Sequence, residues 1–228
     1  MISSVKFLKG YAARFSILGN KIYKFNDRLN VIIGPNGSGK TTLINALAKA
    51  VGCGNGGWSN ELEITYPFKM ELDWDNWPVF YQDCFTDSEE SFISASFLQE
   101  KRLLRSTGEK RIGLINELIN YLENRFLTYK LKAHERPTLL LDEVDNQIGL
   151  VGQSIFWKYL VPKLIKKYQL IISTHSIFPI LLKKETHFRK DNIIKLFRNY
   201  DFMCISELKQ AIDFFNNAPE PEQTVSDV

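Results

Sequence analysis

The sequence of 228 residues is long enough for one sizeable domain, and its 44% hydrophobic and 24% charged residues are ordinary for a globular protein. A net charge of +3 is too small to indicate a nucleic-acid-binding protein, although it leaves room for a local basic face, and three cysteines without CxxC spacing indicate neither a disulfide framework nor a zinc site. No signal peptide and no run of about 18 apolar residues are evident, so we expect a cytoplasmic protein without an integral membrane segment.

The first part of the chain predicts strands around one helix. We expect strands at VKFL (5–8), RFSIL (14–18), KIYKF (21–25), LNVIIG (29–34), ELEITYPF (61–68), KMELDW (69–74) and PVFYQD (78–83). LNVIIG is apolar except for Asn30, as in a strand buried on both faces, whereas KIYKF alternates as a half-exposed strand does. Residues 41–52 have the spacing of a helix.

The second half of the chain alternates between helices and buried strands. From 89 to 125 the pattern is helical, with an interruption at Ser106–Gly108. TLLLDE (138–143) and QLIISTHS (169–176) predict buried strands, and a helix is expected between them at 152–168. This alternation predicts an α/β fold with a mainly parallel sheet, and the early alternating strands predict an antiparallel N-terminal sheet beside it.

GPNGSGKT at 34–41 matches the phosphate-loop pattern G-x-x-x-x-G-K-[ST] in full, and it lies between a buried strand and a helix as the pattern requires. Its glycines let backbone amides turn toward an anion, and the helix start adds the positive end of a dipole. We expect Lys40 to reach the β- and γ-phosphates of ATP and Thr41 to hold Mg²⁺. The predicted ATP-contacting residues are Gly34, Pro35, Asn36, Gly37, Ser38, Gly39, Lys40, Thr41 and Thr42.

Polar side chains close three of the predicted strands. Asp142 and Glu143 end TLLLDE, where Asp142 is expected to hold Mg²⁺ through water and Glu143 to act as the base that polarises the attacking water. His175 ends QLIISTHS and is expected to sense the γ-phosphate. Gln82 ends PVFYQD and is a candidate to contact both the metal ion and the attacking water.

In chain order these features resemble the Walker A, Q-loop, signature, Walker B and switch histidine of an ATP-binding-cassette (ABC) ATPase. RSTGEKR at 105–111 is similar to the signature S-x-G-[QE], with Ser106, Gly108 and Glu109 matching. The resemblance implies that these three residues cap the γ-phosphate of ATP bound by another copy of the chain. It therefore implies a homodimer or higher oligomer with composite ATP sites.

The resemblance also implies the architecture of an ABC ATPase. We expect a three-layer fold with a small helical signature subdomain at about 86–130. A single domain is expected to span residues 1–215, followed by a flexible tail at 216–228.

Two stretches resemble one soluble branch of the ABC ATPases. The opening VKFLKGYAARF and the sequence FNDRLNVIIGPNGSGKTTL are similar to RecF, SMC and OLD-type ATPases, and DEVDN after TLLL differs from the DEPT of transporter cassettes. This branch serves DNA repair, chromosome organisation and phage defence. The short separation of Gln82 from Ser106 leaves no room for a coiled-coil arm of the SMC type. Asp145 or Asn146 would occupy the neighbourhood of the D-loop.

The residue that recognises the base of the nucleotide is left open by the sequence. Candidates to stack on adenine from the early strands are Arg14, Phe15, Tyr23 and Phe25, and each aromatic ring is equally suited to the core. Of these, we take Arg14 as a predicted ATP-contacting residue.

Three functions stay open at this point. The first is a soluble ATPase that controls a DNA- or effector-directed process together with a second protein subunit. Basic residues that could meet DNA phosphates, or simply form solvated helix faces, are Lys101, Arg102, Arg105, Lys110, Arg111, Lys163, Lys166 and Lys167. The second is the nucleotide-binding subunit of a membrane transporter, which RSTGE and DEVDN disfavour. The third is a module that reads ATP without hydrolysing it, which the intact Lys40, Asp142 and Glu143 disfavour.

Overall fold

The computed structural model describes residues 1–14, 17–54, 57–59, 69–83, 120, 124, 136–146, 148–185 and 188–217. Several sequence predictions fall outside these residues. They are the strand at 61–68, the aromatic ring of Phe15, nearly all of the signature region at 86–130 with Ser106, Gly108 and Glu109, and the tail from 218 onward.

In the described residues, the main sheet has six strands in the order β4–β6–β7–β8–β3–β9. All neighbouring strands are parallel except β4 with β6. The strands are β3 (Leu29–Ile33), β4 (Gly57–Trp58), β6 (Val79–Asp83), β7 (Thr138–Asp142), β8 (Gln169–Thr174) and β9 (Ile193–Lys195). β3, β7 and β8 are buried at every position, which explains why their central residues are mostly apolar and do not alternate with polar ones.

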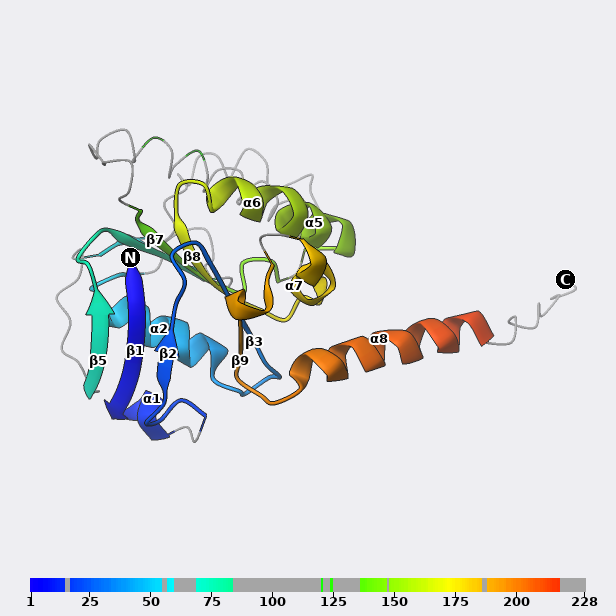
Figure 1. The fold of residues 1–228 in the computed structure, drawn as a ribbon, viewed down its shortest axis with the longest axis horizontal. Coiled ribbons are helices and arrows are strands. Elements are labelled where there is room, and N and C mark those ends of the chain that lie inside the picture. The colour runs from blue at the N-terminus through cyan, green and yellow to red at the C-terminus, as the bar shows by residue number, and fades with distance from the viewer. Residues whose placement is uncertain are drawn as a thin grey trace, which may run out of the picture.

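A second, antiparallel sheet of the order β2–β1–β5 lies at the N-terminal side of the domain (Figure 1). It consists of β1 (Ile2–Lys9), β2 (Ile22–Lys24) and β5 (Lys69–Trp74). The α/β fold with a mainly parallel and an antiparallel sheet is therefore confirmed. The strand predicted at 14–18 is wrong for its described residues, because β1 ends at a turn with Gly10 at φ 99°, Arg14 belongs to the short helix α1 (Tyr11–Arg14), and Ile17 and Leu18 lie in a turn.

Two apolar cores hold these layers together, one on each face of the main sheet. Helix α2 (Lys40–Ala50) lies between the two sheets, where Leu43 and Leu47 pack with β1 and with one face of the main sheet. The opposite face is covered by α5 (Leu150–Ile155), the π-helical segment η1 (Phe156–Leu160) and α6 (Val161–Leu164), which contribute Trp157 and Leu164. The layers are thus an antiparallel sheet with α2, the main sheet, and the α5–α6 segment.

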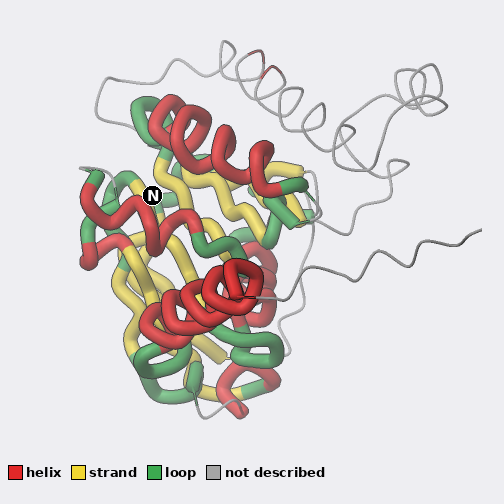
Figure 2. Tube along the Cα trace, turned by 90° about the vertical axis from the view of Figure 1, so that its right-hand side faces the viewer, coloured by secondary structure: helices red, strands yellow, loops and turns green. Residues whose placement is uncertain are grey.

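The C-terminal part completes the second core and then leaves the domain. It contains α7 (Phe178–Leu181), the 3₁₀ turns η2 (Leu182–Lys184) and η3 (Lys190–Asn192), and α8 (Tyr200–Asn217). α8 projects from the domain in Figure 1 and is seen nearly end-on in Figure 2. Among the described residues, no helix combines the length and the apolar character needed to cross a bilayer.

Candidate functional site

The site forms where three neighbouring strands of the main sheet end. β3 pairs with β8 and β8 pairs with β7, all parallel, so their carboxyl ends meet at one edge. The loop after β3 leads into α2, which begins with Lys40 and Thr41. Asp142 ends β7 and Glu143 follows it, and His175 follows β8. Ligands of open parallel sheets bind at such an edge.

The loop after β3 has the conformation that its glycines allow. Gly37 and Gly39 have φ of 74° and 95°, in the left-handed region that side chains rarely adopt. A Cβ at Gly34 would lie 2.4 Å from the Ser38 Oγ, so this position needs glycine for space. The loop therefore folds tightly in front of α2, with its backbone curled around the start of the helix.

Lys40 is folded back over its own loop. Its side chain is only 4% exposed, and its Nζ donates to the carbonyl oxygens of Gly34 (3.1 Å) and Pro35 (3.3 Å). The same Nζ lies 3.7 Å from Glu143 Oε1. Burial lowers the pKa of Lys40, while the carboxylates of Glu143 and Asp142 act in the opposite direction. The ammonium is thus partly desolvated, which strengthens its attraction for an anion.

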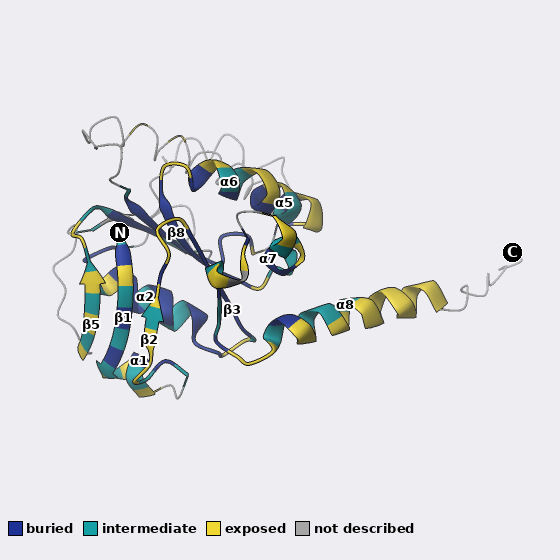
Figure 3. Ribbon diagram, viewed as in Figure 1, coloured by how far each residue is buried: buried dark blue, intermediate teal, exposed yellow. Residues whose placement is uncertain are grey.

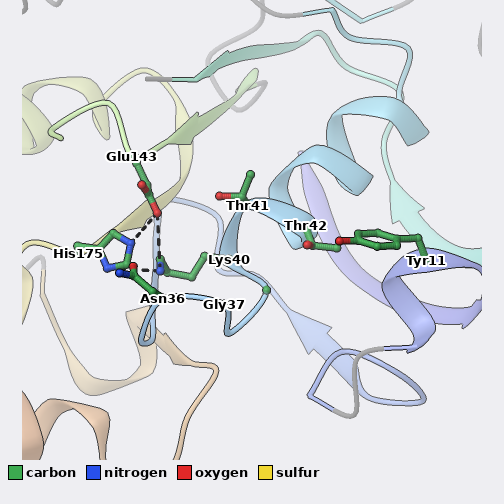
Figure 4. Close-up of a pocket in the computed structure, with 9 residues that line it drawn as sticks. Tyr11, Asn36, Gly37, Lys40, Thr41, Thr42, Glu143 and His175 are labelled. Carbon is green, nitrogen blue, oxygen red and sulfur yellow. Dashed lines mark hydrogen bonds and ion pairs between the residues drawn. The ribbon is translucent and has the colours of Figure 1, made fainter. Parts of the chain in front are cut away.

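Glu143 is held between two groups (Figure 4). His175 Nε2 lies 2.8 Å from Glu143 Oε1, and Lys40 Nζ lies 3.5 Å from His175 Nδ1. Because an ammonium only donates, the second contact requires the tautomer with its proton on Nε2, which is also the tautomer that donates to Glu143. The hydrogen bond from His175 is the largest cause that lowers the pKa of Glu143, and Lys40 acts in the same direction against the opposing effect of burial. The carboxylate is therefore ionised at neutral pH.

Asp142 is fully buried beside the loop, and its donor set fits a magnesium ion. Its Oδ1 accepts from Thr41 Oγ1 at 3.4 Å and from the Ser173 hydroxyl, while Oδ2 has no hydrogen-bond partner among the described residues. Burial raises the pKa of Asp142, so a cation would compensate its charge. No cluster of three or more His, Cys, Asp or Glu side chains occurs in the described part of the chain. Mg²⁺ suits this arrangement because it binds through one or two protein oxygens with water and phosphates.

The turn that follows Glu143 is tied to the next strand and to the helical layer. Asp145 is 2% exposed. Its carboxylate accepts from Trp157 Nε1 at 2.7 Å and from Thr174 Oγ1 at 2.7 and 2.9 Å. Of the two residues expected near a D-loop, Asp145 thus points inward and Asn146 is exposed. Asp145 links the segments that carry Glu143 and His175.

A pocket of about 330 Å³ opens over these groups. It is lined by Tyr11, Asn36, Gly37, Gly39, Lys40, Thr41, Thr42, Glu143 and His175. Figure 4 shows Tyr11 reaching from α1 toward Thr42, at the end of the pocket away from His175. The sequence analysis did not predict Tyr11. The feature that could have indicated it is an aromatic residue directly after Gly10, at the end of the first strand. Arg14, at the end of α1, is exposed and does not line the pocket, so its contact with ATP stays a prediction.

Gln82 lies at the correct edge of the sheet but outside the pocket lining. Its Nε2 donates to the Asp83 carbonyl oxygen at 3.0 Å. It pairs with Leu141, which faces the α5–α6 core, whereas Asp83 pairs with Asp142. Because side chains alternate along a strand, Asp83 shares the face of Asp142. The charge of Asp83 contributes to the raised pKa of Asp142, after the larger effect of burial. The role of Gln82 stays a prediction.

The arrangement can bind a phosphate chain and act on water beside it. It offers an ammonium group, glycine-turned amides at a helix start, a hydroxyl with a buried carboxylate for a cation, and an ionised carboxylate in the same pocket. These features define a P-loop nucleotide-binding domain. The sequence matches the family model of the AAA domain over residues 13–218, and the chain belongs to this family.

Comparison with other proteins gives the following. None of the curated proteins matches the chain. Among solved structures, cbiO1 from Clostridium perfringens, part of the ABC transporter complex cbiONQ, is 18% identical, with 95% of each chain covered and a TM-score of 0.47. A nucleotide-free ATP-binding cassette from an ABC transporter is 16% identical over 79% of this chain and 84% of its own, with a TM-score of 0.41. A putative metal-chelate type ABC transporter in an inward-facing conformation is 16% identical over 78% and 74%, also with a TM-score of 0.41. The family match and the geometry of the site together make this chain a P-loop nucleotide-binding domain.

Proposed function

We propose that the chain is an ATPase that binds ATP with Mg²⁺ at its phosphate loop and hydrolyses it to ADP and phosphate. One observation supports this proposal: Lys40, Asp142 and Glu143 lie close together around the start of α2. The Lys40 ammonium and the Glu143 carboxylate are 3.7 Å apart, and Thr41 contacts Asp142. A module that only reads ATP would need the phosphate loop but not an ionised carboxylate beside it.

The contacts of Glu143 support its role as the base. Without nucleotide its carboxylate is engaged by Lys40 and His175. The phosphates of ATP carry more negative charge than one carboxylate, so they compete with Glu143 for Lys40. Glu143 then keeps only the hydrogen bond from His175 and is available to accept a proton from water. Without nucleotide, His175 contacts both Glu143 and Lys40, which supports its role as a sensor of the phosphate.

Asp142 and Thr41 are the residues that would hold Mg²⁺. When bound, this ion supplies neutralisation of charge on the phosphate oxygens. Tyr11 lines the other end of the pocket and offers a ring on which the base could stack. We therefore propose Tyr11 as the platform for adenine, in place of the more distant Arg14.

We further propose that ATP closes a dimer in which Ser106, Gly108 and Glu109 of one copy contact the nucleotide of the other. The similarity of RSTGEKR to the ABC signature supports this step. The similarity of VKFLKGYAARF and DEVDN to RecF, SMC and OLD-type ATPases supports a role in a DNA- or effector-directed process such as DNA repair or phage defence. The alternative is a transporter subunit, which stable co-purification with a multi-span membrane protein would favour.

The replacement Glu143→Gln tests the hydrolytic role. The variant keeps the shape of the side chain but removes the base, so we expect ATP binding to persist and turnover to fall at least about 100-fold. Lys40→Ala should instead weaken binding itself, because it removes the charge that meets the phosphates. Glu185→Gln, at an exposed position away from the pocket, is the matched control and should leave both quantities unchanged.

Binding is measured by calorimetry and turnover by phosphate release. Normal turnover by Glu143→Gln would refute the assignment of Glu143, whatever the binding result. The mass of the same variant, measured by light scattering with Mg-ATP and then with ADP, tests the dimer. An ATP-bound monomer would refute the proposed pairing of two copies.

A further inference from the structure

Ser173 lies beside Asp142, in a part of the site that water does not reach. The parallel pairing of β7 with β8 places these two residues next to each other. Ser173 is 0% exposed, and it belongs to a strand that is buried at every position (Figure 3). A buried hydroxyl costs free energy unless it finds hydrogen-bond partners. The partners of Ser173 are Asp142, at the end of β7, and Glu143, which follows it.

The hydrogen bonds of the Ser173 hydroxyl have a fixed direction. The Glu143 amide, which can only donate, donates to Ser173 Oγ at 3.2 Å. The single proton of the hydroxyl is therefore left for Asp142 Oδ1, to which Ser173 Oγ donates. One chain of hydrogen bonds thus runs from the Glu143 amide through Ser173 to the Asp142 carboxylate. Hydrogen bonds in such a chain polarise and strengthen one another.

Among the described residues, Ser173 is the closest donor to the Asp142 carboxylate. The other donor, Thr41 Oγ1, lies 3.4 Å from the same Oδ1, beyond the usual range of a hydroxyl hydrogen bond. Asp142 Oδ2 has no hydrogen-bond partner in that part of the chain. The proposed magnesium ion would also engage the Thr41 hydroxyl. Ser173 is then the group that keeps the Asp142 carboxylate in its orientation.

Glu143 depends on Ser173 in a different way. Its amide donates to the Ser173 carbonyl oxygen at 3.0 Å as well as to the hydroxyl. The carbonyl remains when the side chain of Ser173 is shortened, so the backbone turn at Glu143 keeps one of its two acceptors. Removal of the hydroxyl should therefore loosen Asp142 and leave the proposed base in place.

We propose that Ser173 is a positioning residue for magnesium, whose hydroxyl holds Asp142 Oδ1 beside Thr41. The inference rests on the proposed ATPase function, because it assigns a support to the magnesium site of that reaction. Groups that hold a metal ligand from behind typically contribute about 10–100-fold to metal affinity or activity. Ser173 does not touch the phosphates or the attacking water in this assignment, so it acts only through Asp142.

The first test measures the effect of magnesium on nucleotide binding, without turnover. The affinity for a non-hydrolysable ATP analogue is measured by calorimetry with excess Mg²⁺ and with EDTA, and the ratio of the two affinities is the magnesium enhancement. Ser173→Ala should reduce the magnesium enhancement about tenfold. The affinity in EDTA should stay unchanged, because Lys40 and the phosphate loop are intact. Ser173→Cys keeps the size of the side chain but has a weak donor, so it should show a loss in the same direction.

Thr138→Val is the matched control. Thr138 is also 0% exposed, and its Oγ1 donates to Gln169 Oε1 at 2.7 Å, at the opposite end of the same pair of strands. The variant removes a buried hydroxyl hydrogen bond far from Asp142, so it should lower the stability but keep the magnesium enhancement. Urea denaturation followed by circular dichroism establishes which variants are folded. An equal loss of enhancement in Thr138→Val and Ser173→Ala would show a general effect of destabilisation and overturn the proposal.

The second test separates Ser173 from Glu143 by the magnesium dependence of turnover. Ser173→Ala should raise the Mg²⁺ concentration for half-maximal turnover about tenfold and change turnover at saturating Mg²⁺ little. Glu143→Gln should instead lose turnover at every Mg²⁺ concentration. An equal loss at every concentration in Ser173→Ala would assign its effect to the base and refute the proposed role.

The unmodified protein distinguishes failure of this inference from failure of the proposed function. A normal magnesium enhancement that Ser173→Ala and Ser173→Cys both retain would refute the role of Ser173 alone. Equal affinities of the unmodified protein with Mg²⁺ and with EDTA would refute the proposed magnesium site, and the role of Ser173 with it.

Discussion

Replacement of Asp145 by alanine tests how the turn after β7 is held. The Asp145 carboxylate accepts from Trp157 Nε1 and from Thr174 Oγ1, at distances between 2.7 and 2.9 Å. Trp157 and Thr174 are both 0% exposed, so neither donor can turn to water when the carboxylate is removed. The variant therefore leaves two buried donors without an acceptor.

The size of the effect follows from these two donors. A buried donor that loses its acceptor costs about 1–3 kcal/mol, which places the combined loss at roughly 2–6 kcal/mol. Burial raises the pKa of Asp145, so removing the carboxyl group also relieves some desolvation. We expect Asp145→Ala to lower the free energy of unfolding by about 2–4 kcal/mol. Asp145→Asn keeps one acceptor oxygen and should lower it by about 1–3 kcal/mol.

Urea denaturation, followed by tryptophan fluorescence and by circular dichroism, measures the free energy of unfolding. Asp73→Ala, at an exposed position on β5, is the control and should stay within about 0.5 kcal/mol of the unmodified protein. If Asp145→Ala also left the free energy of unfolding unchanged, the conclusion that the buried hydrogen bonds hold the turn would be wrong. Asp145→Asn should also keep more ATP turnover than Asp145→Ala, because it disturbs the position of Glu143 less.

Two further predictions concern other parts of the molecule. Burial raises the pKa of Asp201, but the hydrogen bonds from Lys183 and Lys195 outweigh it and lower this pKa to about 2. The folded state therefore binds fewer protons than the unfolded state between about pH 4 and pH 2, and roughly 2 kcal/mol of the free energy of unfolding should be lost as the pH falls across this window, as urea denaturation at each pH would show. Asp201→Asn should remove this part of the pH dependence, and an unchanged profile would contradict the assignment. At the pocket, Tyr11→Ala should weaken ATP binding about tenfold, and Tyr11→Phe should not, when both are measured by calorimetry. Inorganic triphosphate has no base, so an equal loss of its affinity would show that Tyr11 does not act on adenine.

The parts of the fold that the sequence predicts well are those with strong local signals. Buried parallel strands contain runs of apolar residues, and β3, β7 and β8 were recognised for this reason. The strand predicted from RFSIL at 14–18 is wrong for its described residues, because five residues are too few to separate a strand from a turn that buries an apolar side chain such as Leu18. Leu18 in this segment packs beneath Gly39 of the phosphate loop. Its burial is thus set by residues far along the chain.

The helices also differ from the prediction where local sequence does not determine the structure. The segment predicted as one helix at 152–168 contains the π-helical stretch η1 just before α6. Pro162 lacks the amide that a regular helix would bond to the carbonyl of Lys158, which gives a physical reason for the change of hydrogen bonding there. α8 was not predicted, because its outer half buries nothing within the described chain. Helical periodicity is most easily recognised when one face belongs to a core.

At the site, the sequence locates the residues that a motif fixes and misses those that the fold brings in. Lys40 and Thr41 were predicted from the phosphate-loop motif, and Asp142, Glu143 and His175 from their places at strand ends. The structure brings these five residues together. Tyr11 was missed because it comes from α1, the short helix after β1, which no motif connects to the phosphate loop. The sequence also could not predict that the Asp145 side chain points inward, because this depends on its hydrogen bond from Trp157 in the helical layer.

The backbone of Glu143 explains why the turn after β7 and the position of His175 depend on one another. Its φ is 52°, a left-handed conformation that costs a residue with a side chain about 1–2 kcal/mol. The Glu143 amide donates to the Ser173 carbonyl oxygen at 3.0 Å, and the Asn146 amide donates back to the Glu143 carbonyl oxygen at 2.8 Å. Asp145 closes the turn against Thr174, the residue before His175. Because one strand, β8, supports both the turn and His175, the distance between Glu143 and His175 is fixed by the sheet and not by the flexibility of either side chain. The proposed base and its sensor therefore move together, and a change at the phosphates reaches both.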